Sequence, residues 1–214
     1  MRPRKQLEGL QAVFVRRLRH HRAVIEQTPI GLDGQNEAHV VRATIDCLNS
    51  WSEFVRAYYM SCCIRARTRG GVIVSASSSA VGSPSMALAE AIRITRPRVF
   101  RRGGPWTRYD EPTWRDPGTL RRVAQAVGLT NLDRIDVAFS VATNVFEHLP
   151  KFRNYFGHRN AETAAAIQRL APVYYSTMRE RPAAILRKPL PSRSTCVLSE
   201  FLMDLEGIAR VLCE

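Results

Sequence analysis

Residues 40–59 read VVRATIDCLNSWSEFVRAYY, and this stretch decides the fold. Its apolar side chains recur every three or four positions, which is the spacing of one face of an α-helix. That face is wide and carries large rings such as Trp51 and Tyr58, so most of the helix surface must be buried. We therefore predict a long helix that begins near Asn36 and lies at the centre of an all-α, up-and-down helical bundle.

Weaker helical patterns lie on both sides of this stretch. An amphipathic, arginine-rich pattern precedes it, and the segment from Pro29 to Gly34 supplies a break. Further along, Asp116-Pro117 is an N-cap followed by proline at the first helical position, and Gly128 marks the end of that helix. Asn131 is expected to cap the next helix, which ends at Leu149-Pro150. The sequence thus predicts helices over residues 5–26, 117–127, 131–149 and 198–212, with a connector at 182–191.

Between residues 70 and 117 the helical pattern is lost. Paired glycines, five prolines and a serine-rich run from Ser75 to Ser85 interrupt it, and only Met86 to Ile94 keeps a helical spacing. We predict a loop-rich insertion here, within a single helical domain that covers residues 1–214.

A net charge of +13 and a pI near 10.4 set this chain apart from an average globular protein. A surface with this charge attracts polyanions, so nucleic acid is the leading partner class and a membrane surface is the alternative. Arginine supplies 29 of the 32 basic residues. Guanidinium groups pair with phosphate through two parallel hydrogen bonds, which suits RNA, although codon usage also enriches arginine.

Nine arginines against three carboxylates lie between Arg93 and Arg122. This excess of positive charge has two interpretations. In the first interpretation the segment lines a path for nucleic acid, and in the second it is a solvated loop that faces water.

The five cysteines form neither a CxxC pair nor a Cys/His spacing for zinc, so we expect small buried residues in a reducing compartment and no metal or cofactor. The longest apolar run near the N-terminus, residues 12–15, is too short for a signal peptide, and no segment is long enough to span a bilayer. These features predict a cytoplasmic protein. The cysteines are Cys47, Cys62, Cys63, Cys196 and Cys213.

Residues 152–160 read FRNYFGHRN and contain the candidate catalytic group. An arginine and a histidine five positions apart are weak evidence by themselves, because Arg16 and His21 have the same spacing. The pair of Arg153 and His158 differs in its context. A polar Asn154 follows the arginine, two aromatic residues provide anchors, and a glycine before the histidine leaves room for a phosphate backbone.

The chemistry of these side chains suits RNA cleavage through the ribose 2′-hydroxyl. The imidazole of His158 titrates near neutral pH and can take and return a proton. The guanidinium of Arg153 is permanently charged and can stabilise the extra negative charge on the phosphorus in the transition state. This scheme requires no metal ion.

The block that runs from Glu111-Pro112 through Trp114, Leu120 and residues 129–131 to residues 152–160 resembles the HEPN-domain ribonucleases of bacterial toxin and phage-defence systems. The resemblance covers about residues 111–172, and the first 110 residues match only in general helical character. The family motif, an arginine followed by a polar residue and then a histidine, falls on Arg153, Asn154 and His158. The resemblance implies a helical bundle, a homodimer, metal-independent RNA cleavage and a neutralising antitoxin or defence-system partner.

Helix geometry constrains how this motif works. Residues five apart lie about 140° from each other around a regular helix, so Arg153 and His158 do not share one face. Either the helix begins irregularly near Pro150, or a second copy of the chain completes the site at a two-fold axis. An earlier helix offers a supporting polar residue, but the sequence does not choose among Glu37, Asp46, Asn49 and Glu53.

Position 160 departs from a pattern found in some relatives, where a tyrosine two residues after the histidine is modified by a nucleotidyltransferase antitoxin. Asn160 stands there in this chain, which argues against a partner of that type. Two other functions remain open. The chain is a catalytically silent RNA-binding or partner-binding adaptor, or it is a DNA-binding regulator that uses residues 120–132 as a helix-turn-helix.

Overall fold

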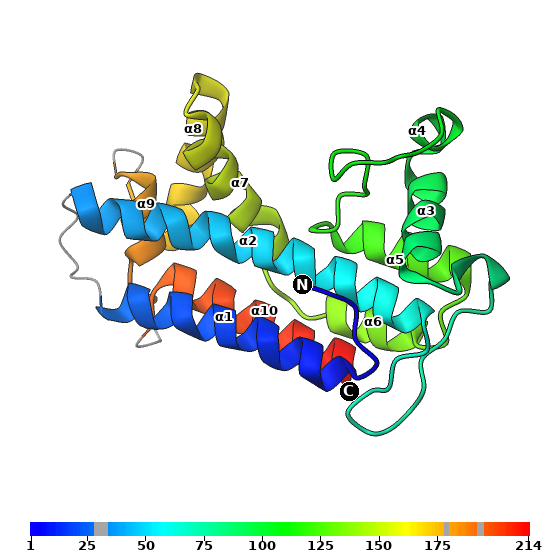
Figure 1. Cartoon of the computed structure of the whole chain (residues 1–214). Helices are drawn as coiled ribbons and strands as arrows, with labels where there is room; N and C mark the ends of the chain where they lie inside the picture. The colour runs from blue at the N-terminus through cyan, green and yellow to red at the C-terminus, as the bar shows by residue number, and fades with distance from the viewer. Residues whose placement is uncertain (28–33, 178–179, 192–194) are drawn as a thin grey trace. The chain divides into compact units, whose positions relative to one another are not determined.

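The computed structural model describes residues 1–27, 34–177, 180–191 and 195–214, and helices dominate it (Figure 1). Within these ranges there is no strand, only isolated bridges. The all-α prediction is confirmed. The helices are α1 (Leu7–Gln27), α2 (Gly34–Cys63), η1 (Ser79–Val81), α3 (Pro84–Thr95), α4 (Pro97–Arg101), α5 (Pro117–Val127), α6 (Leu132–Phe139), α7 (Val145–His158), α8 (Ala161–Leu170), η2 (Ala171–Tyr174), α9 (Pro182–Arg187) and α10 (Val197–Cys213).

The residues group into two compact units. The first unit comprises Met1–Phe14, Ser50–Val141 and Ile208–Glu214, and the second comprises Val15–Asn49 and Ala142–Gly207. Each unit contains its own buried apolar residues. The organisation of residues 1–214 as a single domain stays a prediction.

Aromatic rings form the core of the first unit. The ring of Phe14 stacks on Phe54 with 4.7 Å between centroids, and Trp51 lies 5.8 Å from Phe14. Tyr58 continues the row at 6.2 Å from Phe54. All four side chains are fully buried, so the apolar face predicted for residues 40–59 forms as expected in its second half. Large buried rings contribute more apolar area than any other side chain, which makes this row the anchor of the unit.

Helix α5 begins and ends as the sequence predicts. The carboxylate of Asp116 accepts hydrogen bonds from the backbone N–H groups of Gly118 and Thr119, with Pro117 at the first helical position. Gly128 ends the helix with a φ of +64°, and a Cβ at this position would lie 2.1 Å from the Ser77 hydroxyl. Only glycine satisfies both conditions.

The predicted helix over residues 131–149 is wrong, because two helices occupy this part of the chain. Helix α6 stops at Phe139, and α7 starts only at Val145. Asn131 occupies the N-cap position of α6 but makes no capping bond: its side-chain nitrogen donates to the Tyr58 hydroxyl at 2.6 Å, and its side-chain oxygen is buried without a hydrogen-bond partner among the described residues. The side chain of Asn131 thus makes a tertiary hydrogen bond to Tyr58 and no local hydrogen bond to the first turn of α6.

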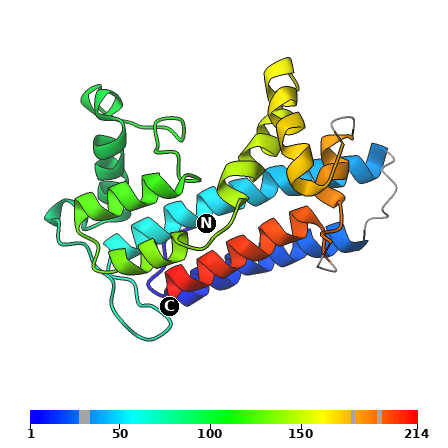
Figure 2. The same ribbon diagram turned by 180° about the vertical axis from the view of Figure 1, so that it is seen from behind.

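The insertion at residues 70–117 contains more helix than predicted. Helix α3 confirms the helical spacing of residues 86–94, and α4 follows it without being expected. In the two views, α3 stands over α5 and carries α4 at its far end (Figures 1 and 2). Glu111 closes this region as a buried carboxylate whose Oε2 accepts from Arg56 Nε at 2.6 Å and from Trp114 Nε1 at 3.0 Å.

In the second unit, α7 and α8 form a hairpin of packed helices (Figure 1). The N-terminal half of α10 lies beside α1, and an ion pair of 2.6 Å joins Arg19 to Glu206 (Figure 2).

The predicted connector at 182–191 is wrong in its first part, since α9 begins at Pro182 with the proline in its first turn. Most of the predicted break at residues 29–34 lies outside the described residues.

Four of the five cysteines are buried, Cys196 is half-buried, and none forms a disulfide. Burial raises the pKa of the thiols of Cys47, Cys62, Cys63 and Cys213, which keeps them protonated. The prediction of small buried residues is therefore confirmed for these four. No helix in the described part of the chain is long and apolar enough to cross a membrane.

Candidate functional site

Helix α7 carries all three predicted catalytic residues on one rigid element. Its buried face consists of Val145, Leu149, Phe152 and Phe156, with the spacing of four, three and four residues that defines one side of a helix. The helix runs without interruption through Pro150. An irregular start near Pro150 is therefore wrong as an explanation of how the motif assembles.

Regular helix geometry then fixes the directions of the three side chains relative to one another. Asn154 and His158 are four residues apart and lie about 40° from each other around the axis, so they share a face. Arg153 and His158 lie about 140° apart. The continuous helix of a single chain presents Asn154 and His158 together and directs Arg153 to one flank.

None of the three side chains is engaged elsewhere in the described part of the molecule. Arg153 and Asn154 are half-buried and His158 is exposed, and neither a hydrogen bond nor an ion pair joins any of them to a described residue. Gly157 is also exposed, and a Cβ placed on it would meet nothing within 4 Å. The C-terminal end of α7 thus carries an exposed imidazole and a half-buried amide and guanidinium, none of which is bonded to a described residue.

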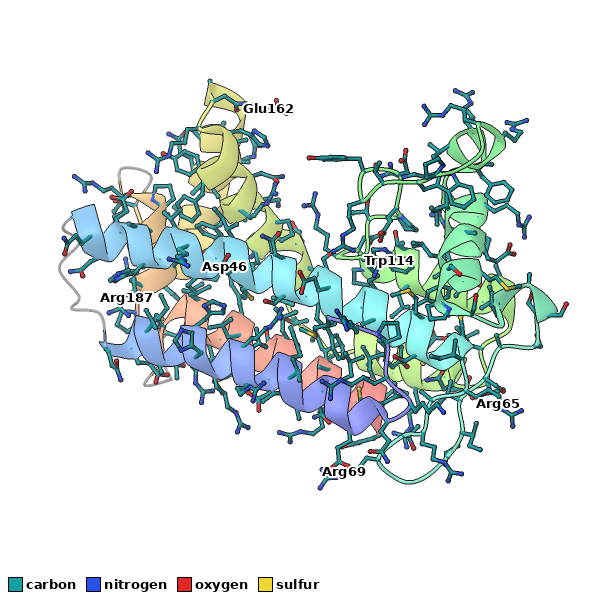
Figure 3. The ribbon with its side chains drawn as sticks, in the orientation of Figure 1. Asp46, Arg65, Arg69, Trp114, Glu162 and Arg187 are labelled. Carbon is teal, nitrogen blue, oxygen red and sulfur yellow. The ribbon has the colours of Figure 1, made fainter. Side chains whose placement is uncertain are left out.

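The turn after His158 is held rigidly. Arg159 adopts the left-handed conformation with a φ of +38° and ends α7. Asn160 then caps α8: its side chain accepts from the Thr163 backbone N–H at 2.9 Å, and its own N–H donates to the Thr163 hydroxyl at 3.2 Å. Glu162 marks this tip of the hairpin in Figure 3. Two adjacent caps therefore position His158 at the tip.

An open pocket of about 520 Å³ lies beside this turn in the same unit. Arg159 lines it together with Glu37 and Asp46 from α2. Asp46, labelled in Figure 3, pairs with Arg42 at 3.5 Å, and Glu37 pairs with Arg181 at 3.4 Å.

The pocket narrows the choice of a supporting polar residue. Of the four candidates, Glu37 and Asp46 line the pocket that adjoins the turn after His158, and Asn49 and Glu53 do not. Glu53 belongs to the first unit, where it binds the amino group of Met1 at 3.0 Å. Glu37 and Asp46 are consequently the residues to test.

A second histidine of α7 was missed by the reasoning from sequence. His148 is buried, and its Nδ1 shares a hydrogen bond of 2.5 Å with the Tyr174 hydroxyl. Burial is the main cause that lowers the pKa of His148, and burial likewise raises the pKa of Tyr174. The available signal was its position, four residues before Phe152 on the apolar stripe. Because His148 is buried and already hydrogen-bonded to Tyr174, we assign it a structural role in the packing of α7.

The pair of Arg16 and His21 on α1, which has the same spacing, lies in a different environment. Arg16 is exposed, and His21 is half-buried with a pKa that is lowered mainly by burial. No described interaction joins the two residues. Their spacing matches that of Arg153 and His158, but His21 lies along a packed helix and His158 lies at an open helix end.

The upstream residues of the block on which the predicted family resemblance rests belong to the first unit. Glu111 and Trp114 form the buried hydrogen bond described above, and Leu120 and Leu129 are buried apolar residues. Glu111 and Trp114 hold the insertion together, and Leu120 and Leu129 pack at α5 and just after its end. Residues 152–160 belong to the second unit.

Among the described residues, no group of three or more His, Cys, Asp or Glu side chains is arranged to hold a metal ion.

Comparison with known proteins gave no family model, no similar curated protein and no similar solved structure that matches this chain.

Proposed function

We propose that this protein is a metal-independent endoribonuclease of the HEPN kind whose active residues are Arg153, Asn154 and His158. The observation that carries the proposal is the arrangement of side chains at the C-terminal end of α7. There, Asn154 and His158 lie opposite the packed face of the helix and Arg153 lies on its flank, beside a glycine that nothing covers, and none of the three side chains is bonded to a described residue.

The proposed reaction is a transesterification within one RNA strand. His158 removes the proton from a ribose 2′-hydroxyl, the 2′-oxygen bonds to phosphorus, and the bond from phosphorus to the 5′-oxygen breaks. The imidazolium then returns the proton to the departing 5′-oxygen. Arg153 stabilises the charge on the phosphoryl oxygens in the transition state, and Asn154 donates a hydrogen bond beside it. The products are a 2′,3′-cyclic phosphate and a 5′-hydroxyl.

A homodimer is part of the proposal. Because α7 is regular, Arg153 and His158 of one chain diverge by about 140°. Two copies related by a two-fold axis through this surface bring the Arg153 of one copy to the His158 of the other. The active unit is therefore a pair of chains.

The first experiment incubates purified protein with labelled single-stranded RNA in the presence of EDTA. Cleavage should persist in the chelator and fall by about 100-fold or more in His158→Ala and in Arg153→Ala. Arg16→Ala and His20→Ala, which alter an exposed arginine and an exposed histidine of α1, are the matched controls and should cleave as the unaltered protein does. RNA with a 2′-deoxy sugar at the cut position should resist cleavage.

A biological role as a toxin or antiviral-defence effector completes the proposal, with an antitoxin or defence-system protein as partner and the cytoplasm as its location. Expression of the unaltered chain should arrest growth, and His158→Ala should relieve the arrest. The alternative is a catalytically silent RNA-binding or partner-binding adaptor. Its supporting observation is that one chain does not bring Arg153 and His158 together, and binding of RNA without cutting in the assay above would favour it.

A further inference from the structure

Residues 93–110 form a compact, strongly basic projection of the first unit, which we call the arginine lobe. It comprises the end of α3, helix α4 and the loop that follows, and α4 lies at the end of α3 remote from α5 (Figures 1 and 2). The lobe contains six arginines and a single carboxylate, that of Asp110. A local excess of this size attracts polyanions.

The arginines of the lobe differ in what they bind. Arg93 is held by Glu90 through two hydrogen bonds, of 2.5 and 2.8 Å, and Arg96 donates to the Tyr109 carbonyl at 2.6 Å. Arg98 and Arg101 are exposed, and neither has a hydrogen bond or ion pair with any described residue. These two guanidinium groups are therefore available to a ligand.

Tyr109 is the most solvent-exposed of the large apolar side chains in the described part of the chain, at 91 %. Its backbone is nevertheless fixed. Arg96 holds its carbonyl, and the neighbouring Asp110 accepts hydrogen bonds from the Thr107 backbone N–H at 2.8 Å and from the Thr107 hydroxyl at 2.9 Å. The ring thus stands in water on a rigid loop.

The rings of Phe100 and Trp106 stiffen the lobe from within. They stack with 5.5 Å between centroids and 16° between planes. Phe100 belongs to α4, and Trp106 belongs to the loop that leads to Tyr109. The stack ties the helix that carries Arg98 and Arg101 to the loop that carries the exposed ring.

We propose that the arginine lobe binds single-stranded RNA, with Arg98 and Arg101 on phosphates and the Tyr109 ring stacked on a base. Proteins that bind single strands combine cationic side chains along the backbone with aromatic rings on which bases stack. A duplex keeps its bases stacked inside, so an exposed ring selects a single strand. The choice of RNA rests on the proposed function, and the binding of a single strand rests on the lobe alone.

Binding is measured with the full chain carrying His158→Ala, in EDTA, by the fluorescence anisotropy of a labelled single-stranded RNA of about twelve nucleotides. Tyr109→Ala should weaken binding by about 5- to 150-fold, the effect of losing one stacked base, and Tyr109→Phe should bind as the parent does. Because the tyrosine is uncharged, the salt dependence of binding should stay unchanged in both variants.

Replacing the arginines of the lobe, unlike replacing Tyr109, should change the salt dependence of binding. Arg98→Gln combined with Arg101→Gln should make the plot of log affinity against log salt shallower by about 1.4, since each phosphate contact to a single strand contributes about 0.7. Arg2→Gln combined with Arg16→Gln removes the same charge from two exposed arginines outside the lobe and is the matched control. Its slope should remain that of the parent.

Inorganic polyphosphate separates stacking from charge, because it has phosphates and no bases. Tyr109→Ala should bind polyphosphate as tightly as the parent does. The proposal is overturned if Tyr109→Ala binds RNA as tightly as the parent, or if the control pair flattens the slope as much as the lobe pair. Single-stranded DNA bound about tenfold more tightly than RNA overturns the assignment to RNA. All these results are independent of whether the unaltered protein cuts RNA.

Discussion

His148 and Tyr174 share a hydrogen bond of 2.5 Å between the imidazole Nδ1 and the phenolic oxygen, and both side chains are buried. Burial lowers the pKa of His148, so the folded chain holds this imidazole neutral at pH values where an exposed histidine begins to take up a proton. The unfolded chain has no such restriction.

The stability of the protein should therefore fall in mild acid through His148. Below about pH 6.5 the unfolded chain binds a proton that the folded chain refuses, so the free energy of unfolding drops as the pH falls. In His148→Gln this contribution is absent, and the loss of Tm between about pH 7.5 and about pH 5.5 should be smaller than in the unaltered protein. His20→Gln, at an exposed site, should keep the full loss. An equal loss in His148→Gln would contradict the prediction.

Replacement of Gly157 by alanine should separate stability from activity. A Cβ at this position meets nothing within 4 Å, and alanine in a helix is more favourable than glycine, so the free energy of unfolding should rise by about 0.5 to 1 kcal/mol. If RNA approaches this turn, the added methyl group stands in its path, and the cleavage rate should fall. Urea unfolding and the RNA assay measure the two effects. A stabilised variant with full activity would remove Gly157 from the proposed site.

Asn160 should be required for the helix cap. Asn160→Ala removes the hydrogen bond to the Thr163 backbone N–H and should lower the free energy of unfolding by about 1 kcal/mol. Asn160→Ser keeps a capping oxygen and should retain most of the stability. Because the cap positions the tip that follows His158, Asn160→Ala should also lower cleavage while Asn160→Ser preserves it. Equal stability of the two variants would show that the capping bond contributes little.

Mixing two inactive variants tests the shared active site. A dimer of one Arg153→Ala chain and one His158→Ala chain contains one site with both residues intact if each site takes its arginine and histidine from different copies. Random exchange should then restore about a quarter of the activity. If each chain supplied both residues to its own site, every site in the mixture would lack one of them. Mixing would then restore nothing.

The local patterns predicted the fold well where burial follows from a single helix. The rings of Trp51 and Phe54 needed only helical spacing to indicate a central helix, and Asp116 and Gly128 define the ends of α5 through contacts close in sequence. Pro150 was misleading, because a proline inside a helix costs about 3 kcal/mol and usually ends it. Burial of Leu149 and Phe152 beside it offsets that cost.

The candidate site was predictable in its residues but not in its assembly. The string around Arg153 and His158 predicts a chemistry that stays a prediction, while the directions of the side chains depend on whether α7 is continuous, which Pro150 concealed. The partner of His148 lies 26 residues away, and the pocket of Glu37 and Asp46 meets Arg159 only in the folded unit. Contacts of this kind come from tertiary packing and leave no short-range pattern.

Three donors converge on one oxygen of Glu111: Arg56 from α2, Trp114 near the end of the insertion, and Arg108 from the arginine lobe at 3.2 Å. This oxygen joins the arginine lobe to α2, whose aromatic side chains form the core of the unit. A buried carboxylate that pairs with two arginines is costly to remove, because both cations lose their counter-charge. Position 111 is also the first residue of the block on which the predicted family resemblance rests. The structural role of Glu111 is therefore to attach the arginine lobe to α2, and the residues that we propose for RNA cleavage begin about forty residues further along the chain.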